Sequence, residues 1–123
     1  MSTTPSSPVL APYICKVNHI AFSVQNAEIS FAFYRDILGA KQLNRPHFSN
    51  NGYWLWLGNV QLHLIENRDK VIIDEFPHAG TNINHLSLEC TDLTQCKHRL
   101  EDSNIAYQEI ITPTDVTNIH QVR

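Results

Sequence analysis

Two segments of this chain of 123 residues share one pattern of apolar and polar positions. Residues 17–24 read Val-Asn-His-Ile-Ala-Phe-Ser-Val, and residues 83–90 read Ile-Asn-His-Leu-Ser-Leu-Glu-Cys. Apolar side chains alternate with polar or small ones in both, as in a strand with one buried face. A helix-start residue follows each copy, at Asn26 and at Asp92. The pattern predicts one supersecondary unit that is used twice.

The first unit reads as one helix among four strands. We predict a strand over Lys16–Val24 and a helix capped by Asn26 and stopped by Gly39. A short strand at Ala40–Leu43 and a loop over Asn44–Gly52 then follow, since Pro and Asn-Gly mark a loop.

A hairpin completes the first unit. Tyr53–Leu57 and Val60–Ile65 alternate in hydropathy and are separated by Gly58-Asn59, which favours a two-residue turn. Such a turn places Leu57 opposite Val60 and fixes the register. The leucine-rich face of the hairpin is expected to pack under a helix. The other face, which is expected to line a concave surface, carries four side chains: Trp54, Trp56, Gln61 and His63.

The second unit repeats the order of elements, with a strand at Ile83–Cys90 whose Cys90 faces the core, a helix at Asp92–Ser103, a strand at Ile105–Ile110 and the start of a strand at Asn118–Arg123. The counterpart of His63 would lie beyond Arg123, so we expect this unit to lack its last strand. The predicted organisation is an α+β domain over 16–123, divided into module one at 16–66, a linker at 67–82 and module two at 83–123, after a disordered tail at 1–15.

Composition excludes several classes of function. A net charge of −3 argues against nucleic-acid binding, and no apolar run approaches the roughly 20 residues that span a bilayer. The Ser/Thr/Pro-rich start lacks the features of a secretory signal. Three cysteines without CxxC spacing predict reduced thiols in a cytoplasmic protein.

Three histidines are the candidate metal ligands. His19 and His85 occupy the same position of the repeated strand, and His63 lies on the corresponding face of the hairpin. Imidazole is the commonest neutral metal ligand, and three such donors suit Zn²⁺, Ni²⁺ or Fe²⁺. Glu66 and Glu89 are weaker candidates for a base or a further ligand, because a strand-end carboxylate is more often simply solvated.

Several of these segments together resemble the vicinal oxygen chelate superfamily of glyoxalases, bleomycin-resistance proteins and extradiol dioxygenases, and are most similar to plant-type glyoxalase I-like proteins. They are Asn18-His19-Ile20, residues 33–39 (Phe-Tyr-Arg-Asp-Ile-Leu-Gly), Trp54-Leu55-Trp56, Gln61-Leu62-His63-Leu64 and Asn84-His85-Leu86-Ser87. The resemblance implies paired βαβββ modules around a divalent metal held by His19, His63 and His85. It also implies a fourth ligand, a glutamate after an Asp-Pro-x-Gly turn, which we expect beyond Arg123.

The resemblance implies a lyase or isomerase that acts on a small thiol-conjugated 2-oxoaldehyde and is impaired by the missing strand. Two alternatives stay open: a non-catalytic module that binds a small ligand, and an Fe(II) ring-cleaving dioxygenase. Substrate contacts are expected from Trp54, Trp56, Gln61 and Gln121. Since an unpaired last strand recruits another strand, we predict a homodimer, with a small-molecule substrate and no nucleic-acid or membrane partner.

Overall fold

The computed structural model describes residues 9–70, 85–113 and 118–122, the last stretch and residues 110–113 by their backbone alone. Most of the predicted linker at 67–82 and the first eight residues of the predicted tail lie outside the described residues. The chain divides into two compact units, Met1–Ile72 and Ile73–Arg123. Within the described ranges, no helix is long and apolar enough to cross a membrane.

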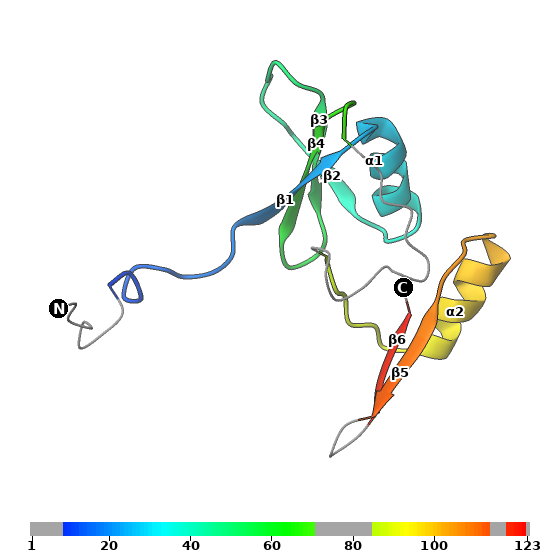
Figure 1. Ribbon diagram of the computed structural model, residues 1–123. Helices are drawn as coiled ribbons and strands as arrows, with labels where there is room; N and C mark the ends of the chain where they lie inside the picture. The colour runs from blue at the N-terminus through cyan, green and yellow to red at the C-terminus, as the bar shows by residue number, and fades with distance from the viewer. Residues whose placement is uncertain (1–8, 71–84, 114–117, 123) are drawn as a thin grey trace. The chain divides into compact units, whose positions relative to one another are not determined.

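The first unit is a mixed four-stranded sheet covered on one face by a helix (Figure 1). In chain order it contains β1 (His19–Val24), α1 (Ala27–Asp36), β2 (Lys41–Leu43), β3 (Gly52–Trp56) and β4 (Gln61–Glu66). The strands lie in the order β1-β4-β3-β2, with β1 parallel to β4 and the other pairs antiparallel. The first and last strands of the unit are therefore neighbours.

Helix α1 begins and ends at the predicted signals. The Asn26 side chain accepts a hydrogen bond from the backbone N–H of Ile29, at 3.1 Å, as an N-cap residue should. Glu66 Oε2 accepts from the N–H of Ala27, at 3.0 Å, and so places a negative charge at the positive end of the helix. Gly39 follows the helix with a φ of 73°, which a residue without a Cβ adopts easily.

The predicted hairpin register is confirmed. Leu57 N–H donates to the Val60 carbonyl at 3.0 Å, and Trp54 lies opposite His63. The leucine-rich face forms the core of the unit: Leu55, Leu62 and Leu64 are completely buried. Around them pack the partly buried side chains of β1 and α1, which are Ile20, Phe22, Val24, Phe31 and Tyr34. Each buried leucine contributes about 1.5–3 kcal/mol relative to an exposed one.

The second unit contains α2 (Leu93–Asp102) and the antiparallel pair β5 (Glu109–Pro113) and β6 (Asn118–Val122). The predicted N-cap is confirmed, because Asp92 accepts from the N–H of Gln95 at 3.1 Å. The α+β class of the chain is also as predicted.

Two expectations for the second unit are wrong. No strand forms over residues 85–90, the described part of the predicted strand Ile83–Cys90, and Cys90 is exposed rather than in the core. The strand expected at Ile105–Ile110 begins later, at Glu109. A strand requires a hydrogen-bonded neighbour, and the described strands of this unit pair only with each other, so alternation alone did not produce a third.

Leu62→Ala should lower the free energy of unfolding of the protein by about 2–5 kcal/mol, because it opens a cavity beneath α1 in a completely buried position. Urea unfolding followed by circular dichroism measures this. Ile29→Ala is the control, since Ile29 is 69% exposed. Equal losses for the two variants would show that the leucine face is not the core.

Candidate metal centre

The candidate site lies on the sheet face opposite α1. Alternation along β1 turns Ile20 and Phe22 toward the core and leaves His19 exposed on the other side. In β4 the same alternation buries Leu62 and Leu64 and turns Gln61 and His63 to the face of His19. Trp54 and Trp56 of β3 lie opposite His63 and Gln61 and share that face. We call it the open face.

His19 and His63 meet on the open face although 43 residues separate them in the chain. Their rings stack with centroids 4.0 Å apart and an interplanar angle of 11°. Trp54 stacks on the opposite side of His63, at 4.2 Å and 6°. His63 is therefore enclosed between two rings and is only 8% exposed.

Each of the two imidazoles has one ring nitrogen held by a neighbouring amide. His19 Nδ1 lies 2.8 Å from Asn18 Oδ1, and His63 Nε2 lies 3.0 Å from Gln61 Oε1. Because the contacting atoms are amide oxygens, the ring nitrogens donate, as assigned from the hydrogen-bond network. The other nitrogen of each neutral ring then carries a lone pair. Such orientation by an outer hydrogen bond is typical of metal-binding histidines.

The surroundings of His63 favour the neutral imidazole. Burial lowers the pKa of His63, and the nearby His19 and Arg45 lower it further because each repels the imidazolium. A metal ligand must be deprotonated, so this environment suits ligation at neutral pH.

The two histidines are adjacent, as ligands of one ion must be, but their rings are stacked with centroids 4.0 Å apart and are nearly parallel. Nitrogen lone pairs lie in the plane of the ring, so one zinc ion at about 2.0–2.1 Å could bind both nitrogens only after one ring turns. The described residues contain no group of three His, Cys, Asp or Glu side chains that could hold a metal. His85, the predicted third ligand, is exposed in the second unit. Its ligation stays a prediction.

The remaining predicted site residues are distributed between the two units. On the open face, Trp56 is 39% exposed, whereas Gln61 is engaged with His63. Gln121 lies in β6 opposite Ile110, in the stretch described by its backbone alone. Glu89 is exposed in the second unit.

Glu66 has a structural role. It lies on the α1 side of the sheet, and its side chain is only 8% exposed. Besides Ala27, it accepts from Asn51 Nδ2 at 3.3 Å and pairs with Arg68 Nε at 2.9 Å. These contacts, the Ala27 N–H first, lower the pKa of Glu66. The carboxylate is thus directed away from the open face and does not serve it as a base.

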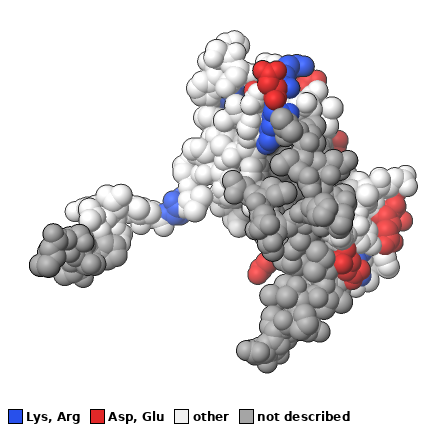
Figure 2. Space-filling view, viewed as in Figure 1, with Lys and Arg blue, Asp and Glu red and all other residues white. Residues whose placement is uncertain are grey.

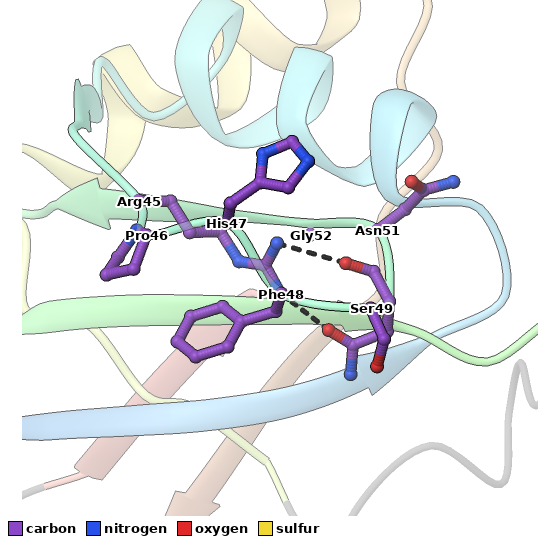
Figure 3. A pocket seen from close by; sticks show the side chains of 8 residues that line it. Arg45, Pro46, His47, Phe48, Ser49, Asn51 and Gly52 are labelled. Atoms are coloured by element: carbon purple, nitrogen blue, oxygen red, sulfur yellow. Dashed lines mark hydrogen bonds between the residues drawn. The ribbon is translucent and has the colours of Figure 1, made fainter.

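A loop beside the open face was missed by sequence reasoning. Residues 45–52 line a cavity of about 440 Å³, in which His47 and Phe48 project to opposite sides (Figure 3). Phe48 packs near Trp54, with ring centroids 6.1 Å apart, and Arg45 lies over the Phe48 ring. Pro46 and Asn51-Gly52 marked the segment as a loop, but no local pattern indicated these contacts.

The fold and the open face define a class: an α+β protein with a βαβββ unit whose first and last strands present two histidines. Residues 16–121 match the sequence model of the Glyoxalase/Bleomycin resistance protein/Dioxygenase superfamily. The chain belongs to this superfamily, and the resemblance found in its motifs is confirmed.

Three relatives show the range of the superfamily. Over 55 residues the chain is 42% identical to metallothiol transferase FosB of Lysinibacillus sphaericus, an alignment that covers 42% of this chain and 38% of FosB. The chain thus spans about two fifths of that relative. The fosfomycin resistance protein FosX of Listeria monocytogenes has a TM-score of 0.61 at 14% identity, over 82% of this chain and 74% of FosX. Lactoylglutathione lyase of Agrobacterium tumefaciens has a TM-score of 0.58 at 16% identity, over 82% of this chain and 80% of the lyase.

In the metal-free protein, NMR titration should give His63 a pKa below 6.5. The folded state then binds fewer protons than the unfolded state between the two pKa values, so stability is present above pH 6.5 and falls as the pH drops through the folded pKa. His63→Gln should remove this part of the pH dependence, whereas His98→Gln, on the exposed surface of α2, should preserve it. A His63 pKa at or above 6.5 would contradict the enclosure of the ring.

The Glu66 carboxylate makes the free energy of unfolding depend on pH in the acidic range. Its folded pKa is lowered, so its stabilising effect is complete above the unfolded value of about 4.3 and is lost as the pH falls through the folded pKa. Urea midpoints should therefore decline below about pH 4–5 in the native protein and less in Glu66→Gln. Glu28→Gln, also in the first turn of α1 but exposed, should follow the native profile.

Proposed function

We propose that this protein is a divalent-metal enzyme that isomerises a small thiol-conjugated 2-oxoaldehyde. The observation that supports the proposal is the pair His19 and His63, which are adjacent and oriented by amides on an open sheet face, with surroundings that lower the pKa of His63. A metal-containing relative also supports the proposal: a structure of FosX contains Mn(II) and a dihydroxypropylphosphonic acid.

In the proposed enzyme His19, His63 and His85 hold the ion, which when bound supplies Lewis-acid stabilisation of negative charge on the substrate. Gln61 keeps the His63 ring in one orientation through the 3.0 Å contact. Trp54 and Trp56 offer an apolar surface on which a thioether-bearing substrate can lie, and Gln121 is proposed to contribute a polar contact. The strand residues that the structure places on the open face include no carboxylate base.

A second candidate function is metal-dependent transfer of a thiol to an electrophile. The specific observation in its favour is the 42% identity to metallothiol transferase FosB, although the alignment covers 55 residues. Both functions use the metal that the histidines would hold, and both involve a thiol. In the isomerase the thiol is already part of the substrate, whereas in the transferase it reacts with a separate electrophile. The ring-cleaving alternative is less well supported, because it needs a carboxylate beside two histidines and Glu66 lies on the opposite side of the sheet.

The test combines metal analysis and turnover in the purified protein. After incubation with Zn²⁺, Ni²⁺, Fe²⁺ or Mn²⁺, we expect one bound ion per site. We also expect impaired activity on the hemithioacetal of glutathione and methylglyoxal, monitored as thioester formation, because the strand residues of the open face offer no carboxylate to move the proton. His19→Ala and His63→Ala should each weaken metal binding by at least about tenfold, since loss of an outer partner alone costs about 10–100-fold.

His98→Ala is the matched control, an exposed histidine on α2 that should change neither metal content nor rate. Consumption of fosfomycin and a thiol, without action on the hemithioacetal, would favour the transferase. Metal or ligand binding without either reaction would identify a non-catalytic binding module. Metal stoichiometry that survives the His19→Ala/His63→Ala double variant would exclude the proposed centre. Light scattering during purification tests the proposed homodimer.

A further inference from the structure

Two arginines of the first unit lie over aromatic rings, but only one has an anionic partner. Arg35 lies 4.9 Å from the centre of Phe31, and its guanidinium makes two hydrogen bonds to the carboxylate of Asp36. Arg45 lies 4.7 Å from the centre of Phe48. Among the described residues, no carboxylate pairs with Arg45. Its positive charge is therefore uncompensated within that part of the chain.

The guanidinium of Arg45 is nevertheless held in place. Its Nη1 donates to the Asn50 carbonyl at 3.1 Å and its Nη2 to Asn50 Oδ1 at 2.7 Å (Figure 3). The group also lies against Gly52, where an added Cβ would be 3.0 Å from Arg45 Nη2 and 2.3 Å from the Leu64 carbonyl oxygen. A glycine at this position thus lets the guanidinium pack closely on the backbone of the sheet.

The hydrogen bonds of Arg45 are incomplete. An arginine has five N–H donors, and two of them are used, both by the neutral Asn50. Nε is buried without an acceptor among the described residues, so the donors left for a ligand are the second N–H of Nη1 and the second N–H of Nη2. Unused donors on a cation that is held in place are expected where a ligand or a water completes them.

The surroundings of Arg45 favour a negatively charged ligand. No Asp or Glu lines the cavity of residues 45–52, and on the face that Figure 2 shows, the surface over the loop between β2 and β3 carries no acidic side chain. Ser49 also lines the cavity and has a hydroxyl that can donate a hydrogen bond, whereas His47 and Asn51 point to the side opposite Phe48 (Figure 3). The nearest carboxylate in this network, Glu66, is reached through Asn51 but is already paired with Arg68 and the Ala27 N–H. Its charge is thus directed elsewhere.

We propose that the loop 45–52 is a binding site for a small oxyanion, a carboxylate or a phosphoryl group, with Arg45 as its anchor. The remaining N–H of each Nη can donate to an oxygen of such a group, and the fixed position of the guanidinium reduces the entropy lost on binding. Phe48 packs near Trp54, which stacks on His63, so the site lies beside the open face. The site needs no metal, and its test is independent of the proposed enzyme activity.

The experiment uses the metal-free protein and two probes, inorganic phosphate and acetate. Titration at low ionic strength, monitored by ¹H–¹⁵N NMR and by tryptophan fluorescence, should give saturable changes centred on residues 45–54. Arg45→Gln should weaken binding by about 10–100-fold, the loss of one charge-assisted hydrogen-bonded pair worth about 1.5–3 kcal/mol. Preference for phosphate over acetate, or the reverse, identifies the kind of oxyanion.

Arg35→Gln is the matched control, because it removes the same charge and the same kind of aromatic contact but from an arginine that Asp36 already neutralises. It should change the affinity by less than about twofold, since exposed charges at a distance are screened. Arg45→Lys keeps the charge without the fork, and partial retention of binding by this variant shows that the loop remains folded. Equal affinity of Arg45→Gln and the native protein, or no saturable change with either probe, would overturn the proposal.

Discussion

Burial of Leu62 and Leu64 beneath α1 fixes the direction of every other side chain in β4. Successive residues of a strand point to opposite faces, so burying these two leucines turns Gln61 and His63 to the open face. A shift of one residue in register would place the imidazole in the core and the leucines in water. The cost of that exchange, about 1.5–3 kcal/mol for each leucine before the buried imidazole is counted, specifies the site.

The same constraint brings the two histidines together. The sequence of elements returns β4 to the side of β1, and the parallel pairing sets Ala21 opposite His63 and His19 opposite Gln61. His19 in β1 is therefore two residues away from Ala21, the residue paired with His63, and on the same face, so the two rings can stack. Trp54 closes the other side of His63 from β3. Enclosure between rings removes water from His63, and loss of water is the main cause of its lowered pKa.

Short-range sequence signals were sufficient to predict most of the helices and strands of the first unit. The two-residue turn after Leu57 and the alternation beside it determined the hairpin, and side-chain caps determined where α1 and α2 begin. They failed where structure depends on distant partners. Residues 85–90 alternate as well as β1 does, yet form no strand in the described structure, since no neighbour provides a ladder. Arg45 escaped notice for a related reason: its contacts depend on how a long loop folds back on Gly52.

The charges around the open face also bear on the substrate. Neutral imidazoles leave the positive charge of a divalent ion uncompensated, in contrast to a ligand set that includes a carboxylate. Arg45 adds a second positive charge close enough to lower the pKa of His63, and the strand residues on the open face include no carboxylate. Under the proposed function, both cations attract the same kind of molecule. An anionic group held by the loop and negative charge stabilised at the histidines would then belong to one substrate, with the Phe48–Trp54 contact as the apolar surface between them.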